Sequence, residues 1–425
     1  MIEIDLLLKN IKQLVNPAAD DAVRGQWLNS LRLLENVWLG GRGETINFIG
    51  FERDFQNNCR LRPEAVTIDC SDFVVMPGFV DPHTHLPFAG TRQDEFQQKL
   101  QGVSYQEIAR QGGGIVKTVR QTRQIEANEL VALCEHRLDQ MLLSGTTTCE
   151  AKSGYGLDRV TELKQLESLQ AVAALHPIDI VPTFMGAHDV PGEFSAKNRE
   201  FLDFLLREVL PEVKRRNLAE YVDIFCEEGY FSLADAEYYL EQAGRLGFTL
   251  KVHADEFTSN GAAAMAARRN AVSAEHLLAI TTDEIDTLAA SDTVAVLLPG
   301  VPFFLRLNRY APVRQLVQKN GIVALGSDFN PGSSMVSSQL FIFYLAVFMM
   351  GMTIEEALNA VTINAACAVN RQGRLGSLAV GKKMDALLLE IADYRYLAYH
   401  LGISPVHTVI KSGEIVVQEK RIVFR

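Results

Sequence analysis

Two histidines separated by a single residue, His83 and His85, carry the clearest chemical signal in this chain. They follow the apolar run 73–80, in the string Asp-Pro-His-Thr-His. Side chains at positions i and i+2 of an extended segment lie on the same side, so both imidazoles can bind one metal ion. The alternative is that both are ordinary surface histidines, because an HxH tripeptide often arises by chance. Further ligands elsewhere in the chain would favour the metal.

Three more potential ligands, His253, His276 and Asp328, come shortly after short apolar runs. Taken singly, each has an ordinary explanation as a strand-end histidine, a helix cap, or a turn residue. Five such residues, each at the end of a predicted strand, are hard to obtain by chance. Neutral imidazoles and a carboxylate suit Zn²⁺ or iron, and a site that keeps a position open to water is catalytic.

Short apolar runs alternate with longer helical patterns, such as 126–143 and 159–175, between about residues 76 and 370, which predicts a parallel β/α fold. Eight runs predict strands that end in polar residues: 74–80, 146–150, 180–185, 222–226, 249–252, 271–274, 294–298 and 322–325. This pattern favours a (β/α)8 TIM-type barrel, whose active site lies at the C-terminal strand ends. An open, doubly wound sheet is the alternative, but its ligands would gather at one switch point.

The two ends of the chain lack this alternation. They contain short β-like runs separated by turn residues: 46–48, 66–69, 386–389, 408–410 and 415–417. Because neither end is large enough to fold alone, we expect both to pair into one small β-sandwich. The predicted domains are therefore a barrel of residues 76–370 and a composite β-sandwich of residues 1–75 and 371–425.

Composition narrows the class of protein. The net charge of −11 argues against nucleic-acid or anionic-membrane binding. Six scattered cysteines without a CxxC motif suit a reducing cytosol, and the acidic N-terminus does not resemble a signal peptide. The most apolar run, 340–352, spans about a dozen residues, short of the roughly 20 that cross a bilayer. We expect a cytoplasmic protein, with this run as a barrel helix or, alternatively, part of the face of a homodimer.

Several motifs now resemble the amidohydrolase superfamily: residues 75–85, 252–257, 273–277, 325–333 and 379–386. Within it, the chain resembles the imidazolonepropionase family in Phe-Ala-Gly-Thr-Arg (88–92), Glu-Ala-Lys-Ser-Gly-Tyr-Gly-Leu (150–157), Gly-Ala-His (186–188) and Asp-Phe-Asn-Pro-Gly-Ser (328–333). The resemblance implies a barrel with an added sandwich and a hydrolase of histidine breakdown. The reaction would open the cyclic amide of 4-imidazolone-5-propanoate to give N-formimidoyl-L-glutamate.

The resemblance also implies the metal count. Superfamily members with two metals usually bridge them with a carbamylated lysine on strand 4, and residues 222–228 contain no lysine. We therefore expect a single Zn²⁺ or iron ion per subunit, held by His83, His85, His253 and Asp328. Lys152, at the end of strand 2, is expected to serve structure or charge balance.

The chemistry assigns roles to three residues. A bound ion lowers the pKa of water to about 7, and the attack on a ring amide builds an oxyanion that must be stabilised. By analogy His276 would polarise the carbonyl, Asp328 would take the proton of the attacking water, and Glu256 would pass a proton to the leaving nitrogen. The alternative for Glu256 is a solvated loop acid.

A propanoate substrate calls for a cation and hydroxyl donors. Arg92 offers a planar fork for a carboxylate, Tyr155 a hydroxyl, and His188 a hydrogen bond to the ring. The other positions that coincide with ligand-binding positions of the family are Asn330, Gly332 and Ser333. On sequence alone, Arg92 and Asn330 can equally be structural.

Two other functions compete with this one. A related deaminase of a heterocyclic base would share the metal residues, but the set containing Arg92 and Tyr155 suits an anionic side chain that a free base lacks. An inactive scaffold is the remaining alternative, although such proteins usually lose their metal ligands, and this chain keeps the whole set.

Overall fold

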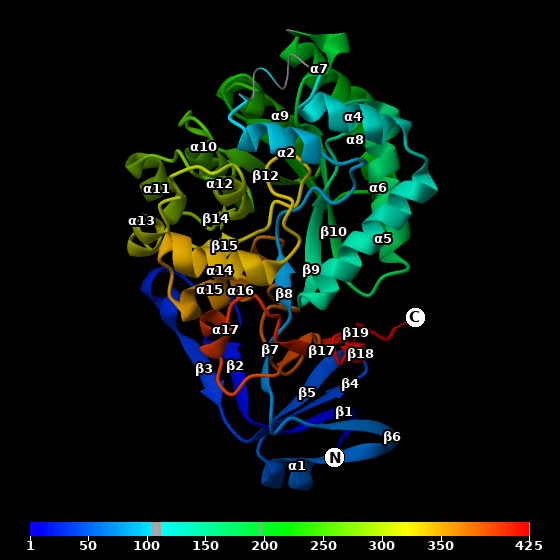
Figure 1. Cartoon of the computed structure of the whole chain (residues 1–425), viewed down its shortest axis with the longest axis vertical. Helices are drawn as coiled ribbons and strands as arrows, with labels where there is room; N and C mark the ends of the chain where they lie inside the picture. Colours follow the sequence, from blue (N-terminus) through cyan, green and yellow to red (C-terminus); the bar gives the residue numbers. More distant parts are fainter. Residues whose placement is uncertain (104–106, 108–111, 196, 425) are drawn as a thin grey trace.

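The computed structural model describes residues 1–103, 107, 112–195 and 197–424, and it has two parts along its long axis (Figure 1). A barrel wrapped in helices forms the larger part. Layered β-sheets near both chain ends form the smaller one. Among the described residues, no helix is long and apolar enough to span a membrane.

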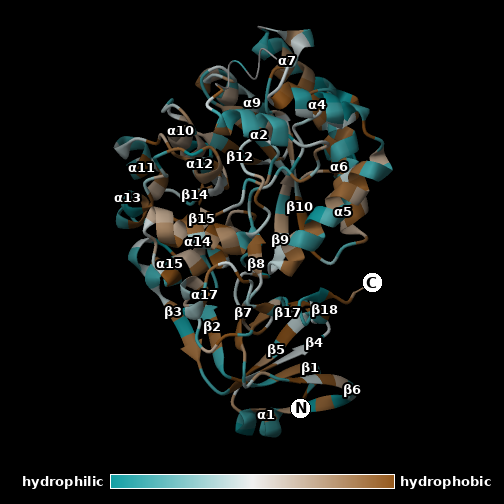
Figure 2. Cartoon of the chain, in the orientation of Figure 1, coloured by the Kyte–Doolittle hydropathy of each residue, from teal (hydrophilic) through white to brown (hydrophobic). Residues whose placement is uncertain are grey.

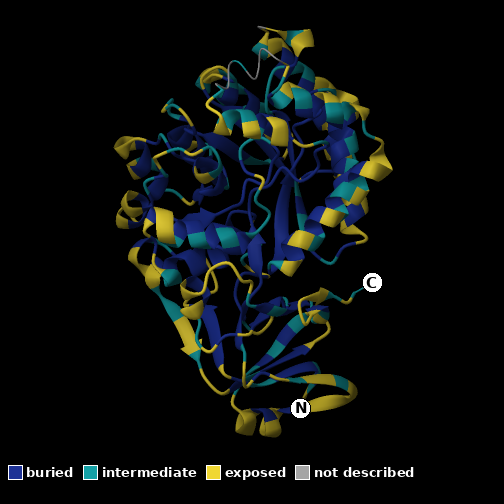
Figure 3. Cartoon of the chain, viewed as in Figure 1, coloured by how far each residue is buried: buried dark blue, intermediate teal, exposed yellow. Residues whose placement is uncertain are grey.

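Eight neighbouring parallel strands build the barrel, in the order β15-β14-β13-β12-β11-β10-β9-β8. They are β8 (Phe79–Asp81), β9 (Thr146–Lys152), β10 (Asp179–Ala187), β11 (Tyr221–Cys226), β12 (Thr249–Ala254), β13 (Ser273–His276), β14 (Val294–Leu297) and β15 (Val323–Leu325). Nearly all of their residues are buried (Figure 3), as expected for parallel strands covered by helices. The predicted barrel is confirmed.

Helices cover the outside of the barrel, and most have a hydrophobic and a hydrophilic face (Figure 2). They are α2 (Gln93–Leu100), α4 (Ile115–Gln124), α5 (Ala127–Leu143), α6 (Arg159–Ala173), α7 (Asn198–Phe204), α8 (Leu210–Arg215), α9 (Leu233–Arg245), α10 (Ala262–Arg268), α11 (Thr282–Ala289), α12 (Gly300–Phe304), α13 (Val313–Gln318), α14 (Gln339–Met350), α15 (Ile354–Ala360) and α16 (Ile363–Cys367), with the short 3-10 helix η2 (Gly192–Phe194) and the π-helical segment η3 (Leu205–Val209) between α7 and α8. The two predicted helices are α5 and α6, and the apolar run 340–352 forms α14. A capping box formed by Glu126 and Glu129 fixes the start of α5.

The flanking strands form two sheets. The seven-stranded sheet has the order β19-β18-β17-β16-β7-β2-β3, and the four-stranded sheet has the order β5-β4-β1-β6. The strands are β1 (Ile2–Ile11), β2 (Gln13–Pro17), β3 (Leu31–Leu34), β4 (Val37–Arg42), β5 (Thr45–Gly50), β6 (Cys59–Asp69), β7 (Val74–Pro77), β16 (Ala386–Leu389), β17 (Val406–Lys411), β18 (Glu414–Gln418) and β19 (Arg421–Ile422), with the helical segments η1 (Gly25–Asn29), α1 (Glu52–Asn58) and α17 (Tyr396–Tyr399). One apolar cluster, which includes Leu6, Leu39, Val75 and Leu388, joins the two sheets. Both chain ends therefore contribute to a sandwich, as expected from the sequence.

The apolar run 74–80 is not one barrel strand, and that expectation was wrong. Its first part is β7, which pairs with β16 and β2 in the flanking sheet, and its last part is β8 in the barrel. Gly78 alone separates the two strands, and a Cβ on Gly78 would lie 2.2 Å from the Thr147 hydroxyl. One run of sequence thus serves both parts, and the domain limits at residues 76 and 370 stay a prediction.

The barrel closes between its first and last strands, just beyond β8 and β15. There Thr84 and Phe329 form a parallel bridge. The His85 N–H donates to the Phe329 carbonyl (3.0 Å), and the Asp328 N–H donates to the His83 carbonyl (3.0 Å). Closure of the barrel therefore holds the HxH segment directly against the loop that carries Asp328.

A buried glutamine also links β8 and β15 at the junction where the barrel closes, which we call the seam. Gln339, on the largely hydrophobic helix α14, donates its amide to the carbonyls of Val80 (2.7 Å) and Leu325 (3.0 Å), on β8 and β15. Gln339 is fully buried, so water cannot replace it.

We predict that Gln339→Leu destabilises the protein by about 2–4 kcal/mol, because it leaves two buried carbonyls without a donor. Urea unfolding followed by circular dichroism measures the change. Gln318→Leu, at an exposed position of α13, is the control and should shift the midpoint little. Equal midpoints for both variants would contradict a role of Gln339 in the seam.

Candidate metal centre and active site

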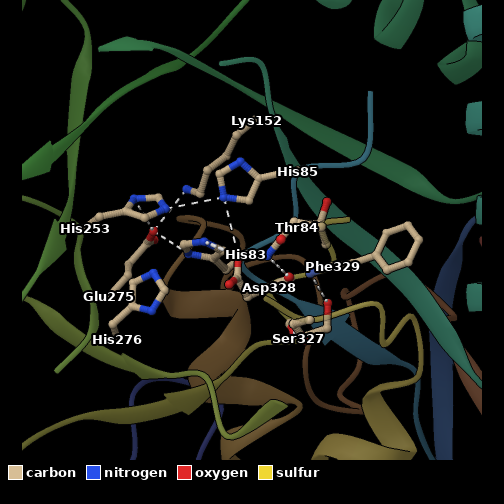
Figure 4. A network of polar contacts seen from close by, with 12 residues as sticks. His83, Thr84, His85, Lys152, His253, Glu275, His276, Ser327, Asp328 and Phe329 are labelled. Atoms are coloured by element: carbon tan, nitrogen blue, oxygen red, sulfur yellow. Dashed lines mark hydrogen bonds and ion pairs between the residues drawn. The ribbon is translucent and has the colours of Figure 1, made fainter. Parts of the chain in front are cut away.

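Three imidazoles and one carboxylate meet at the C-terminal end of the barrel (Figure 4). His83 Nε2 and His85 Nε2 lie 3.2 and 3.4 Å from Asp328 Oδ1. His253 Nε2 lies 3.4 Å from His85 Nε2, and all four side chains are buried. Tetrahedral ligands bound to zinc at about 2.0–2.1 Å are separated by roughly 3.3 Å. The spacing of these atoms therefore fits one such ion.

The electrostatics of the cluster also favour a cation. Burial alone would lower the pKa of His83, but the carboxylates of Glu275 and Asp328 raise it to about 9. Burial would raise the pKa of Asp328, but hydrogen bonds from His83 and His85 hold it well below its usual value. Positive charge is thus stabilised between His83 and Asp328, the place where a divalent ion would lie.

Two carboxylates support the ligands from behind. His83 Nδ1 lies 2.5 Å from Glu275 Oε2, and His253 Nδ1 lies 3.0 Å from Asp223 Oδ2. An acceptor at Nδ1 keeps the ring proton there and leaves the Nε2 lone pair free to bind a metal. This pattern is typical of imidazoles that bind metal.

His276 and Glu256 lie beside the cluster and are both buried. His276 Nε2 lies 3.7 Å from Glu256 Oε2. Burial lowers the pKa of His276 to about 4, and burial together with the negative charge of Asp328 raises the pKa of Glu256 well above its usual value. At neutral pH, His276 is therefore a neutral imidazole, and the raised pKa of Glu256 favours its protonated form.

The backbone is strained at this site. His276, Leu277 and Asp328 have positive φ values of 76°, 61° and 49°, a region that residues other than glycine rarely adopt. Such conformations gather at functional sites, where the surrounding structure holds them in place.

Arg92 lies at the start of α2, beside Gly332 in the turn that follows Asp328. Its Nε donates to Glu95 Oε2 (2.8 Å), and both side chains are buried. Its Nη1 packs closely on Gly332, where an added Cβ would lie only 2.4 Å away. A cavity of about 240 Å³, lined by Arg92, Lys99, Phe304 and Gly332 among others, opens next to it.

The rings of Tyr155 and His188 pack next to His85. The His188 ring stacks on His85 with a centroid distance of 5.0 Å, and the Tyr155 ring lies 5.2 Å from His188. His188 Nδ1 lies 3.0 Å from the Gly154 carbonyl. The Glu162 carboxylate shapes this loop by accepting three backbone N–H groups, those of Gly154, Gly156 and Leu157.

Asn330, Gly332 and Ser333, which were predicted to contact the substrate, form hydrogen bonds with one another. Asn330 Oδ1 accepts the N–H groups of Gly332 and Ser333, both at 2.8 Å, and its Nδ2 donates to the Asp328 carbonyl (2.7 Å). The three residues thus form the turn that presents Asp328. Their direct contact with a substrate stays a prediction.

Comparison with known proteins identifies the family. The model of the amidohydrolase family matches residues 74–416. An imidazolonepropionase of Bacillus cereus is 45% identical over 97% of this chain and 96% of its own length, and one of Bacillus anthracis matches equally well. The chain belongs to the imidazolonepropionase family of amidohydrolases. It is therefore a hydrolase.

Solved structures show the same fold at low sequence identity. An adenosine deaminase from Xanthomonas campestris with bound zinc superimposes with a TM-score of 0.71 at 19% identity, over 100% of this chain and 95% of its own. A variant of atrazine chlorohydrolase TrzN from Arthrobacter aurescens, complexed with zinc and atraton, has a TM-score of 0.71 at 14% identity, over 99% and 97% of the two chains. These likenesses support the barrel and its added sheets.

The sequence analysis missed the residues behind the metal ligands, chiefly Asp223, Lys251 and Glu275. A signal for them exists in the strand pattern. Lys251 lies two residues before His253 and must point to the same side of β12. Glu275 is the β-partner of His253 on the neighbouring strand β13. Charged residues inside otherwise apolar barrel strands therefore mark the environment of the ligands.

We predict that Asp328→Ala weakens zinc binding by more than the roughly 10–100-fold typical of losing an outer partner of a ligand, because it removes a ligand itself. Zinc titration against a competing chelator measures the change. Asp72→Ala, at an exposed position, should bind zinc like the unaltered protein. Unchanged affinity in Asp328→Ala would contradict its assignment as a ligand.

Proposed function

We propose that the protein hydrolyses the cyclic amide of 4-imidazolone-5-propanoate to N-formimidoyl-L-glutamate. The observation that carries this proposal is the buried cluster of His83, His85, His253 and Asp328 in a chain that is 45% identical to imidazolonepropionases. The water attacks the ring carbonyl, the C–N bond of the amide breaks, and the ring nitrogen leaves with a proton.

One Zn²⁺ or iron ion per chain would be held by the four side chains of that cluster. Such an ion polarises a carbonyl and lowers the pKa of water, which provides a nucleophile at neutral pH. The ligand set accepts either metal, since imidazole and carboxylate suit both.

The surrounding residues would move the protons. Asp328 is ionised, because its pKa is held well below the usual value, so it can accept a proton from the attacking water. Burial and the negative charge of Asp328 raise the pKa of Glu256, which favours the protonated form that can donate a proton to the leaving nitrogen. His276 is neutral and can donate an N–H to the oxygen on which negative charge develops.

The loops around the cluster would select the substrate. The guanidinium of Arg92, fixed through Nε by Glu95, keeps its outer N–H groups for the propanoate. Tyr155 and His188 would contact the imidazolone ring from the side of His85, with Asn330, Gly332 and Ser333 completing the pocket. A free heterocyclic base has no carboxylate to occupy the Arg92 end.

We also propose that the protein acts in the cytoplasm as a homodimer. All six cysteines are buried and free, which suits a reducing compartment.

The direct test is an assay of purified protein with 4-imidazolone-5-propanoate, cytosine and guanine in parallel. Ring opening of the imidazolone, with no ammonia from either base, is the expected result. Ammonia release from a base without imidazolone hydrolysis would contradict the proposed function.

Arg92→Ala is expected to raise KM for imidazolone propanoate roughly 10–100-fold with little change in kcat, because a charge-assisted contact with the propanoate is lost. Steady-state kinetics measure both constants. Arg120→Ala, an exposed arginine on α4, is the control. A KM for Arg92→Ala equal to that of the control would show that Arg92 is structural.

Glu256→Gln should lower kcat roughly 100- to 10,000-fold, because the amide cannot donate an acidic proton to the leaving nitrogen. Bound zinc should stay unchanged, since Glu256 is not one of the four ligands. Glu228→Gln, at a nearby exposed acid, serves as the control. Full kcat in Glu256→Gln would exclude Glu256 as the proton donor.

A further inference from the structure

Beneath the metal ligands, inside the barrel, lies a layer of five charged side chains that have no solvent exposure. They are Glu150 and Lys152 on β9, Asp223 on β11, Lys251 on β12 and Glu275 on β13. Burying a charge in this way is costly unless partners compensate it. Three carboxylates and two ammonium groups leave the layer with one excess negative charge, directly behind the predicted cation.

One ammonium group contacts all three carboxylates. Lys152 Nζ lies 2.7 Å from Glu150 Oε1, 2.8 Å from Asp223 Oδ2 and 3.0 Å from Glu275 Oε2. The last two oxygens are the same atoms that face the metal-binding imidazoles, Asp223 Oδ2 toward His253 Nδ1 and Glu275 Oε2 toward His83 Nδ1. Figure 4 shows the Lys152 side chain directed toward Glu275, close to His253.

We propose that Lys152 is a positioning residue for the metal centre. Its ammonium fixes the two carboxylate oxygens that orient His83 and His253, so that both Nε2 atoms face one ion. The inference rests on the proposed metal centre. It gives a reason for a lysine with no solvent exposure at this position.

The same contact accounts for a single ion. Asp223, His253 and Glu275 place ligand atoms within 4.8 Å of one another, a group that could hold a cation of its own. The Lys152 ammonium already supplies a positive charge to both carboxylates of that group. A fixed side-chain cation thus takes the place of a second metal.

Lys251 offers a built-in comparison. Its Nζ lies 2.9 Å from Glu275 Oε1 and 3.2 Å from the Pro82 carbonyl. It therefore contacts the other oxygen of Glu275, and within the described part of the chain it makes no hydrogen bond or ion pair with Asp223. Loss of Lys251 removes the same charge from the layer but leaves the link between Asp223 and Glu275.

The test is the zinc dissociation constant of metal-stripped, full-length protein, measured by competition with a chelator. Four proteins are compared: the unaltered chain, Lys152→Met, Lys251→Met, and Glu150→Gln combined with Lys152→Met. The double variant restores the net charge of the layer without restoring the ammonium. Glu150 Oε2 accepts the N–H of Thr84 (3.3 Å), between the two histidine ligands, and the side-chain oxygen of a glutamine can accept the same N–H. Thermal unfolding of each metal-free protein reports folding separately.

We expect Lys152→Met and the double variant to bind zinc roughly 10–100-fold more weakly than the unaltered chain, the range typical for partners of metal ligands. Lys251→Met should lose less. If Lys152→Met does not fold, the double variant carries the test.

Three results would overturn the proposal: zinc affinity within twofold of the unaltered chain in folded Lys152→Met, recovery of that affinity in the double variant, or an equal loss in Lys251→Met. The last two would show that only the charge of the layer matters. Failure of the unaltered chain to bind zinc would instead contradict the metal centre itself.

Discussion

The structure depends on burying like charges together at one end of a barrel. Glu150, Asp223, Glu275 and Asp328 are all buried there, and their negative charges must be compensated. Lysines inside the barrel compensate part of the charge, and the imidazoles are arranged to share a cation for the rest. A metal ion held by these imidazoles would therefore compensate buried negative charge as well as supply the chemistry.

The junction between the first and last strands of the barrel brings the ligands close together. The HxH segment leaves the first strand and the Asp328 loop leaves the last, and backbone hydrogen bonds join them where the barrel closes. His85 and Asp328, which are 243 positions apart in the sequence, therefore lie just beyond the ends of neighbouring strands. Asn330 bonds the turn that presents Asp328, and Glu162 on α6 accepts backbone N–H groups of the loop 154–157 that carries Tyr155. The proposed ligands and the proposed substrate-binding residues thus both lie on short segments that follow the C-terminal ends of the barrel strands.

Much of this was predictable from the sequence, because barrel strands buried on both faces appear as short apolar runs and their polar ends mark the active face. The predicted ligands meet in the structure for that reason. The division of run 74–80 was not predictable from hydropathy, since both halves are equally apolar and only their pairing partners differ. The β1 strand was also missed, although Ile2-Glu3-Ile4-Asp5-Leu6 alternates apolar and polar residues as a half-buried strand does. The charged layer escaped notice because single acids and lysines within a strand do not reveal that they face one another across a barrel.

Anomalous diffraction at the zinc edge, from crystals of the unaltered chain grown with zinc, tests the central claim most directly. The account predicts one peak per chain, about 2.0–2.2 Å from Nε2 of His83, His85 and His253 and from the Asp328 carboxylate. A second peak between Asp223 and Glu275 would contradict it, as would a single peak bound by other side chains.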